Sequence, residues 1–251
     1  MNPARLSVAI ITYNEAANIA RTLSSVAWAN EIIVVDSGST DGTLEIARDH
    51  GAKVLVEQWR GFAPQKNFAI RQCTGDWILS LDADEELSSQ LAAEIREVLK
   101  APKANAYFIP RRNFFLGRWI RHGGYYPDPK LRLFRRGAAT FAERVVHETM
   151  QTTAPTATLH NDLLHHAYQT LTSYIEHMNR YSTLGAQTIT AHGKPRGLLW
   201  NALIAPIATF IYNYIFRLGF LDGREGLLLH LYHSAYVSWK YAKAWDNMRS
   251  T

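Results

Sequence analysis

The chain has 251 residues, 47% of them hydrophobic and 20% charged, which is the composition of a folded globular chain with one large domain or one domain and an appendage. Its single cysteine, Cys73, excludes an internal disulfide framework and a cysteine-based zinc site and favours a reducing cytosol. The formal net charge of +5 at pH 7 fits an anionic ligand or membrane surface better than DNA, and the sequence has no zinc-finger spacing, aromatic RNA-binding motif or Lys/Arg block, so no nucleic-acid partner is expected.

The first hundred residues alternate between two patterns. Apolar runs rich in β-branched residues predict strands buried on both faces, at 6–11, 31–36, 53–57 and 76–82. Segments with helical spacing of apolar residues alternate with these runs, at 15–28, 42–50, 64–72 and 86–100. This alternation predicts an α/β fold with a mostly parallel sheet flanked by helices. The opening run is too short to span a membrane and lacks a small-residue cleavage site, so we expect a strand and not a signal peptide.

The pattern changes after residue 101. Further strands are predicted at 106–114, 130–136 and 157–167. The segment 117–129 is rich in Gly, Pro and aromatic residues and is typical of a long functional loop, which contains His122, Gly123 and Gly124. From about residue 170 the chain is predicted to be helical, so we expect a sheet-containing domain over 1–168 and a helical C-terminal region over 169–251.

Four acids are crowded into "LSLDADEEL" where the fourth strand ends: Asp82, Asp84, Glu85 and Glu86. Their mutual repulsion must be offset by solvent, by a helix N-terminus or by a bound cation. At a strand-to-loop corner Asp82 and Asp84 can converge on Mg²⁺ or Mn²⁺, which prefer oxygen ligands. The alternative is an acidic start to the helix over 86–100, where negative charge favours the helix dipole.

Polar side chains also end the first two predicted strands. Ligands of parallel sheets bind at the carboxyl ends of the strands, and Asp36 lies at such an end. It begins "DSGSTDGT", whose small residues let backbone N–H groups approach a ligand; the alternative is a plain turn that caps the next helix. The first strand ends in the same style, with residues that would face the same cleft: Thr12, Tyr13 and Glu15.

Three blocks together carry a resemblance to a known family. The succession "AIITYNEAANI", "EIIVVDSGSTDGT" and "WILSLDADEEL" resembles the nucleotide-sugar half of family 2 glycosyltransferases with the GT-A fold, over about residues 5–100 and more loosely to about 170. "FFLGRWIRHGGYYPDPKLRLFRRGAATFAERVVHE" resembles the WaaE-type lipopolysaccharide-core β-glucosyltransferases. The resemblance implies an inverting, metal-dependent transfer of a sugar, with glucose expected, from a UDP-sugar to lipopolysaccharide core or a similar glycolipid.

The resemblance also implies roles for individual residues. Asp36 would hold the nucleotide, in a nucleoside pocket that is lined by Thr12, Tyr13 and Glu15. Lys66 would contact the nucleotide, with a solvated helix face as the alternative. Asp82 and Asp84 match the D-x-D motif, with Asp84 as the direct ligand of Mg²⁺ or Mn²⁺. His165 would complete the metal shell, although a lone histidine is more often a core or surface residue.

The general base is assigned by the same resemblance. Glu148 in "ERVVHE" matches the position of the catalytic acid residue in many relatives, which more often carry Asp in an Glu-Asp pair. Glu143 and Asp128 are the alternative candidates for the base. If Glu148 is not the base, it would be an acid at the start of a helix. A set of arginines can face an anionic acceptor or form a solvated strand edge: Arg111, Arg112, Arg132, Arg135 and Arg136.

The segment 198–216 contains no charged residue and is just long enough to cross a bilayer core. Asn201 and Pro206 interrupt it, so we expect membrane-surface association or a protein interface in preference to a span. Aromatic anchors would be Trp200, Tyr212 and Tyr214. The expected location is cytoplasmic and peripheral, at the inner face of the inner membrane, and a homo-oligomer remains open.

Two other functions stay open. One is a polyprenyl-phosphate or other surface-polysaccharide sugar transferase of the same fold. The other is a non-catalytic nucleotide-sugar-binding protein that recruits partners through its helical tail. A dehydrogenase is disfavoured, because no G-x-G-x-x-G follows the first strand.

Overall fold

The structure is a computed structural model that describes residues 4–142, 149–191 and 197–249. It divides into two compact units. The first, which we name the sheet unit, has its described residues at 4–111, 128–142 and 149–166. The second, the helical unit, takes 112–127, 167–191 and 197–249. The helical unit also includes most of the predicted long loop, and the expected division of the chain at 168 stays a prediction.

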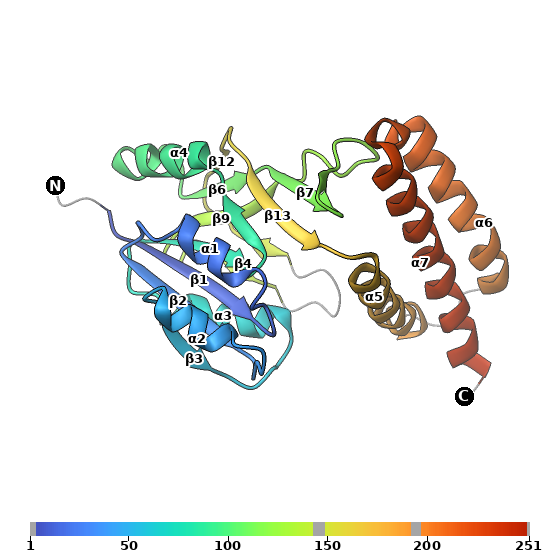
Figure 1. Ribbon diagram of the computed structural model, residues 1–251, viewed down its shortest axis with the longest axis horizontal. Helices are drawn as coiled ribbons and strands as arrows, with labels where there is room; N and C mark the ends of the chain where they lie inside the picture. The colour runs from blue at the N-terminus through green and yellow to red at the C-terminus, as the bar shows by residue number, and fades with distance from the viewer. Residues whose placement is uncertain (1–3, 143–148, 192–196, 250–251) are drawn as a thin grey trace. The chain divides into compact units, whose positions relative to one another are not determined.

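The core of the sheet unit is a seven-stranded sheet in the order β12-β6-β9-β4-β1-β2-β3 (Figure 1). β1, β2, β3 and β4 are all parallel, and β9 is antiparallel to β4 and β6, so the sheet is mostly parallel as predicted. The strands are β1 (Leu6–Thr12), β2 (Glu31–Asp36), β3 (Lys53–Val56), β4 (Trp77–Asp82), β6 (Ala106–Ile109), β9 (Lys130–Arg135) and β12 (Thr156–Thr158).

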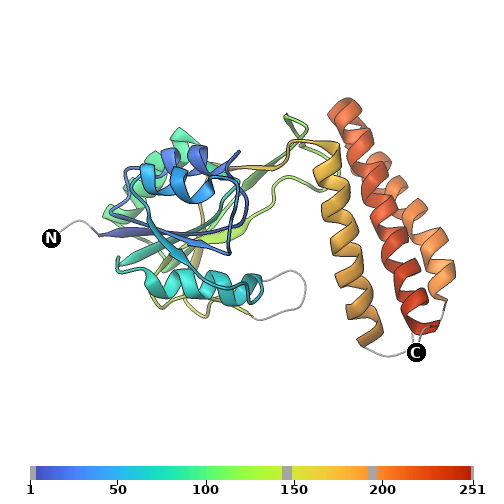
Figure 2. The same cartoon turned by 60° about the horizontal axis from the view of Figure 1, so that its bottom comes forward.

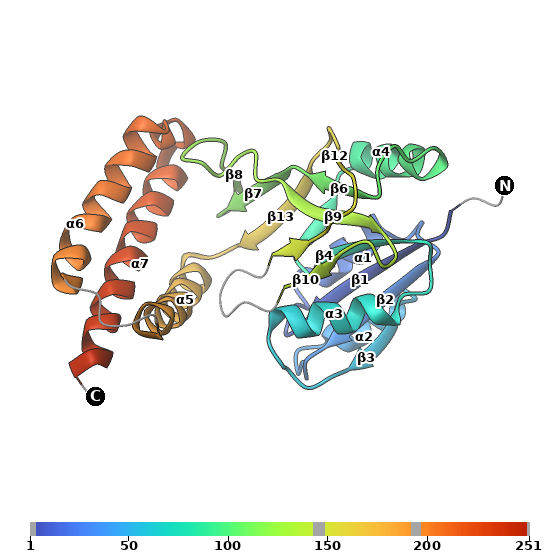
Figure 3. The ribbon, with the colours of Figure 1, turned by 180° about the vertical axis from the view of Figure 1, so that it is seen from behind.

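Helices cover both faces of this sheet, because its central strands are apolar on both sides. Val8 and Ile10 of β1 pack with α1, α2 and α4, whereas Ala9 and Ile11 pack with α3 on the opposite face. Figure 3 shows α3 in front of the sheet, seen from behind the view of Figure 1. The helices are α1 (Ile19–Ser25), α2 (Thr43–Asp49), α3 (Phe62–Gln72) and α4 (Ser89–Lys100).

One predicted helix start is wrong. The segment expected as helix 86–100 begins as β5 (Glu85–Leu87), which pairs antiparallel with β13 (Leu163–Tyr168). The helix starts only at Ser89, where the Ser88 hydroxyl caps it by accepting a hydrogen bond from the Leu91 N–H at 3.2 Å. Glu85 and Glu86 are thus strand residues, and the acid cluster is not the first turn of a helix.

Two predicted strands are each divided in two. Pro110 interrupts 106–114 between β6 and β7 (Arg111–Phe115), since proline has no N–H for the ladder. The predicted strand 157–167 becomes β12 and β13, with a turn between them. β10 (Thr140–Phe141) pairs antiparallel with β11 (Met150–Gln151).

The helical unit consists of a β-hairpin and long packed helices. β7 pairs with β8 (Arg118–Trp119), and α7 packs along both α5 and α6 (Figure 2). One apolar cluster joins Phe115 and Ile120 to Tyr174 and Leu229. The helices are α5 (Leu171–Ala191), α6 (Leu198–Phe210), the π-helix η1 (Ile211–Phe216), the 3₁₀-helix η2 (Gly219–Asp222) and α7 (Gly223–Arg249).

Candidate active site

Three predicted site residues meet at one edge of the sheet. Thr12 is the register partner of Asp36 in the parallel β1–β2 pair, and Ile11 is the partner of Asp82 in β1–β4. All three strands therefore end at the same edge, where parallel sheets bind their ligands. The Thr12 hydroxyl is buried and has no hydrogen-bond partner among the described residues, which is unusual for a buried polar atom.

Asp36 shapes the loop that follows β2. Its Oδ1 accepts hydrogen bonds from the N–H groups of Gly38 and Ser39, both at 2.7 Å, and the Ser39 hydroxyl donates to its Oδ2. Gly38 has a φ of +99°, a conformation that side chains disfavour. The carboxylate is fully buried, so in this geometry it orders the loop; its contact with a nucleotide stays a prediction.

The loops after β1 and β2 are joined to each other. The Asn14 N–H donates to the Ser39 hydroxyl at 2.8 Å, and the Glu15 N–H donates to Thr43 Oγ1 at 2.9 Å. Burial raises the pKa of Glu15 to about 7 despite a hydrogen bond from Asn18, and the nearby carboxylates of the acid cluster add to the rise. Glu15 therefore lies in the negative field of this sheet edge, and its place in a nucleoside pocket stays a prediction. Tyr13 is exposed beside it.

Asp82 is held by two buried cations. Lys66 Nζ of α3 lies 2.7 Å from Asp82 Oδ1, and Arg132 Nη2 of β9 lies 2.7 Å from Oδ2. Burial alone would raise the pKa of Asp82, but the charges of Lys66 and Arg132 outweigh it and hold the pKa well below its ordinary value. The repulsion between the crowded acids is thus offset by cations of the chain itself. Lys66 is buried, so it does not belong to a solvated helix face.

A second group of charges extends from the fully buried Glu85. Its Oε1 lies 2.6 Å from Arg132 and 3.0 Å from Arg111, and its Oε2 accepts the Asp82 N–H at 3.0 Å. Arg111 continues to Asp128, which also meets Lys130 at 2.8 Å. Burial opposes ionisation of Asp128, but Arg111 and Lys130 prevail and lower its pKa to about 2. Arg111 and Arg132 are therefore inside the charged network and not at a solvated strand edge.

Asp84 faces a different partner from Asp82. Its Oδ2 lies 3.3 Å from His165 Nε2, and the His166 N–H donates to its backbone oxygen at 3.0 Å. Burial would raise the pKa of Asp84, but the charge and hydrogen bond of His165 lower it below its ordinary value. Antiparallel pairing of β5 with β13 creates this contact, because His165 lies opposite Glu85.

The side chains of Asp84 and His165 carry atoms that suit a divalent metal ion. Asp84 and His165 offer one carboxylate oxygen and one imidazole nitrogen, and Mg²⁺ and Mn²⁺ commonly complete such a set with water and substrate phosphates. Asp82 is turned toward Lys66 and Arg132, so the described residues contain no group of three His, Cys, Asp or Glu side chains placed to hold a metal. The predicted set of Asp82, Asp84 and His165 stays a prediction.

Two candidate base residues cannot be placed at this edge, and two residues that do lie there were not predicted as site residues. The predicted base Glu148 and its alternative Glu143 lie outside the described residues. The sequence places Glu85 among the crowded acids, and it leaves Arg132 either facing an anionic acceptor or at a solvated strand edge. A usable signal existed for Arg132, because Leu131 and Leu133 flank it in a buried strand where a charge requires a partner.

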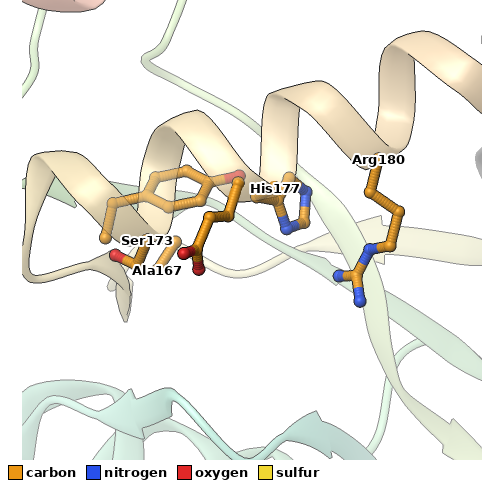
Figure 4. A pocket seen from close by; sticks show the side chains of 6 residues that line it. Ala167, Ser173, His177 and Arg180 are labelled. Carbon is orange, nitrogen blue, oxygen red and sulfur yellow. The ribbon is translucent and has the colours of Figure 1, made fainter.

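The helical unit has a hollow of its own, of about 380 Å³, along α5. Figure 4 shows Ser173, His177 and Arg180 arranged along the helix beside it. Tyr168 and Tyr181 contact the His177 ring at 5.3 and 4.1 Å between centroids. The hollow thus presents an acid, an imidazole and a guanidinium, none of which was predicted as a site residue: Glu176, His177 and Arg180.

Comparisons with known proteins agree along the chain. The model of glycosyl transferase family 2 matches residues 7–159. The lipopolysaccharide core biosynthesis glycosyltransferase LpsC of Rhizobium meliloti (strain 1021) is 31% identical, covering 94% of this chain and 93% of the relative. The uncharacterised glycosyltransferase RP128 of Rickettsia prowazekii (strain Madrid E) is 31% identical over 89% of this chain and 81% of its own. The mannosyltransferase PcManGT from Pyrobaculum calidifontis, solved with GDP-Man and Mn²⁺, superposes with a TM-score of 0.55 at 18% identity, covering 98% and 88% of the two chains, which confirms the GT-A-type fold.

Proposed function

The chain belongs to glycosyl transferase family 2, and from that premise we propose that it transfers glucose from UDP-glucose to lipopolysaccharide core or a similar glycolipid. The observation that carries the proposal is the contact of Asp84 with His165, beside an Asp82 that is held ionised at the carboxyl edge of the sheet. Asp82 and Asp84 lie within the residues that the family model matches, 7–159, and His165 follows them.

The reaction proposed is a single displacement with inversion. The acceptor hydroxyl oxygen attacks the anomeric carbon, the bond from that carbon to the diphosphate oxygen breaks, and its electron pair leaves with the nucleotide. A carboxylate on the acceptor side takes the hydroxyl proton. We assign this role to Glu148, with Glu143 as the alternative. Asp128 is disfavoured, because a carboxylate with a pKa of about 2 between Arg111 and Lys130 is a weak base.

The donor would lie across the strand ends. Thr12, Tyr13, Glu15 and Asp36 would form the nucleoside pocket, and Lys66 would approach the diphosphate from its place on Asp82. When bound, Mg²⁺ or Mn²⁺ supplies positive charge that neutralises the leaving diphosphate. Asp84 and His165 would hold the ion. Asp82, whose oxygens both meet cations, would then fix Lys66 and Arg132 at this edge.

A glycolipid acceptor is supported by the similarity to LpsC and by the surface of the helical unit. Leu198–Phe216 is long and apolar enough to cross a membrane by length and composition, with a mean hydropathy of 1.4. Only 11% of this apolar stretch is buried within the protein. A stripe of exposed side chains recurs every four residues along it: Leu199, Leu203, Ile207, Ile211 and Ile215. We propose that this face rests on the cytoplasmic side of the inner membrane, as amphipathic interfacial helices do.

Binding of a nucleotide sugar tests the proposal directly. A panel of UDP- and GDP-sugars, with and without Mn²⁺, is screened for an increase in melting temperature, and the true donor should raise it more with metal. Purified protein is then given the donor with heptose-containing core or with polyprenyl phosphate, which separates the two acceptor classes. Asp84→Ala should abolish the Mn²⁺-dependent part. If no nucleotide sugar stabilises the protein, the proposed function fails; binding without transfer or hydrolysis would leave the non-catalytic alternative.

A further inference from the structure

A second hollow of the helical unit combines cationic and aromatic side chains. It has a volume of about 330 Å³ and is lined by Arg118, Trp119, Arg121, His122, Leu221 and Asp222. Arg118 and Arg121 are exposed, and the Arg121 guanidinium stacks over the Trp119 ring at 4.1 Å from its centroid. The Trp119 Nε1–H is buried and has no acceptor among the described residues. An unpaired buried donor is costly, and this indole N–H is a polar group beside the hollow that lacks a protein partner in the part of the chain that the structure describes.

The acids of this hollow are already engaged. Asp222 is buried and accepts hydrogen bonds from the backbone N–H groups of Arg121 and His122, at 3.2 and 2.8 Å, and its Oδ1 lies 3.0 Å from His122 Nδ1. Glu225 lies 3.6 Å from Arg118. The helical unit also has four exposed arginines, which outnumber these two carboxylates: Arg118, Arg121, Arg217 and Arg224. The local charge is therefore positive and suits an anion.

An apolar projection borders the same hollow. Leu218, Phe220 and Leu221 are 46%, 44% and 50% exposed, and Leu221 itself lines the hollow. Leu218 adopts a φ of +60°, which is strained for a leucine and which glycine would adopt without strain. Folding alone therefore favours glycine at this turn, whereas the sequence places a large apolar side chain in solvent there.

From this combination we propose that the hollow binds the phosphate of an anionic phospholipid, with Leu218, Phe220 and Leu221 inserted among the lipid chains beside it. Exposed guanidinium groups next to exposed leucines are complementary to a bilayer surface, where phosphates lie directly above hydrocarbon. The inference rests on the proposed function only for its setting, since a glycolipid acceptor lies in a membrane.

Two alternatives to this surface contact with a membrane fit less well: a transmembrane arrangement of the helices and a contact with a second copy of the chain. A transmembrane arrangement would take α7 into the bilayer with α6, because Leu198 packs on Ala244 and the Ser238 hydroxyl donates to the Ala202 oxygen at 2.9 Å. Charged residues of α7 such as Lys240 would then lie within the bilayer, where an ionised side chain is unfavourable. A second copy of the chain would bring this arginine-rich surface against itself, and like charges across an interface are unfavourable.

The test measures partition of the full chain onto vesicles. Vesicles of phosphatidylcholine alone are compared with vesicles that also contain phosphatidylglycerol, by co-sedimentation at low and high salt. We expect binding to the anionic vesicles that weakens with salt. Arg118→Ala and Arg121→Ala should each lower the partition coefficient about fivefold. Leu218→Gly should lower it several-fold while leaving the melting temperature equal or higher, which excludes unfolding as the cause.

Matched variants in the sheet unit serve as controls. Arg48→Ala removes an exposed arginine and Val56→Ser an exposed apolar side chain, and neither should change vesicle binding. Binding that is unaffected by Arg118→Ala and Arg121→Ala overturns the proposal. The proposal is also overturned if inorganic phosphate displaces the protein from both kinds of vesicle equally and the protein shows no preference for anionic vesicles. A protein that dimerises and does not bind vesicles overturns it as well. The vesicle assay contains no nucleotide sugar, so a negative result there does not contradict the proposed transfer reaction. If instead only nucleotide-sugar binding fails, the lipid site still stands.

Discussion

Lys66 and Asp82 form an ion pair of 2.7 Å between a buried ammonium group on α3 and the last carboxylate of β4. Together with Arg132 on the other oxygen, this pair explains how acids can crowd at a sheet edge in the described structure. It also keeps a positive charge at the place where a diphosphate is expected. The pair therefore links the stability of the sheet unit to its proposed donor chemistry.

Removing the ammonium group should destabilise the protein. In Lys66→Met, Asp82 keeps Arg132 as a partner, so we expect a loss of about 2–3 kcal/mol, less than the effect of a wholly unpaired buried charge. Urea unfolding measures it. Lys100→Met is the control, because Lys100 meets Glu97 in an exposed pair that is worth less than about 1 kcal/mol. Equal losses in the two variants would contradict a structural role for the Lys66 pair.

The raised pKa of Glu15 predicts an unusual dependence of stability on pH. In the folded protein Glu15 holds its proton up to a pKa of about 7, whereas an exposed glutamate of the unfolded chain has its ordinary pKa of 4.5. Stability from this group is thus fully present below about 4.5 and is lost as the pH rises through 7. Glu15→Gln should remove this slope and raise the free energy of unfolding at pH 8 by up to about 3 kcal/mol.

Urea unfolding at pH 5 and pH 8 checks this prediction. Glu45→Gln, an exposed acid in the first turn of α2, is the matched control and should leave the slope unchanged. A bound divalent cation should flatten the slope of the unmodified protein as well, because positive charge at this edge lowers the pKa of Glu15. A slope that persists in Glu15→Gln would assign the effect to another group.

The contact between Asp84 and His165 predicts which side chains control metal affinity. Asp84→Asn and His165→Ala should each weaken Mn²⁺ binding in the presence of UDP by at least about tenfold, a loss that even outer-shell changes reach. The shift in melting temperature with Mn²⁺ concentration gives the affinity. His160→Ala removes an exposed histidine of the same unit and should have no effect. If the Mn²⁺ affinity of His165→Ala is unchanged, His165 is not a ligand, and carboxylates alone supply the protein's ligands to the ion.

Much of the sheet could be predicted from the sequence, since its central strands are buried on both faces and leave continuous apolar runs. The positions of Thr12, Asp36 and Asp82 at one edge followed from parallel topology alone. β5 was missed because "EEL" before a helix resembles a helix start, and only its hydrogen bonds to β13 make it a strand. That pairing is tertiary and leaves no local signal.

The partners of the site acids were harder to predict. Lys66 comes from the helix before β4 and Arg132 from an antiparallel strand fifty residues beyond Asp82, so no local spacing connects them. Asp84 and His165 were proposed together through a family resemblance, and their contact depends on the β5–β13 register. The predicted functional loop contains His122, Gly123 and Gly124, which pack within the helical unit on Asp222, His230 and Arg217.

Gly123 allows this packing, and its replacement should be costly for a specific reason. It has a φ of +65°, and a Cβ atom there would lie 2.0 Å from Cε1 of the buried His230 ring. Gly123→Ala therefore combines backbone strain of about 1–2 kcal/mol with a clash that displaces a core side chain. Gly117→Ala is the matched control, because Gly117 has a φ of +80° and nothing within 4 Å of a Cβ, so only the backbone cost remains.

A double-mutant cycle in urea isolates the clash from the strain. His230→Ala opens space at Gly123, so the two changes together should cost less than the sum of the single variants. The coupling should be at least about 1 kcal/mol, the range found for residues in direct contact. Gly117→Ala combined with His230→Ala should be additive, since the backbone cost of Gly117 does not involve the ring. If Gly123→Ala costs no more than Gly117→Ala, the "HGG" glycines are not explained by packing on α7, and a role at the donor or acceptor site becomes the better explanation.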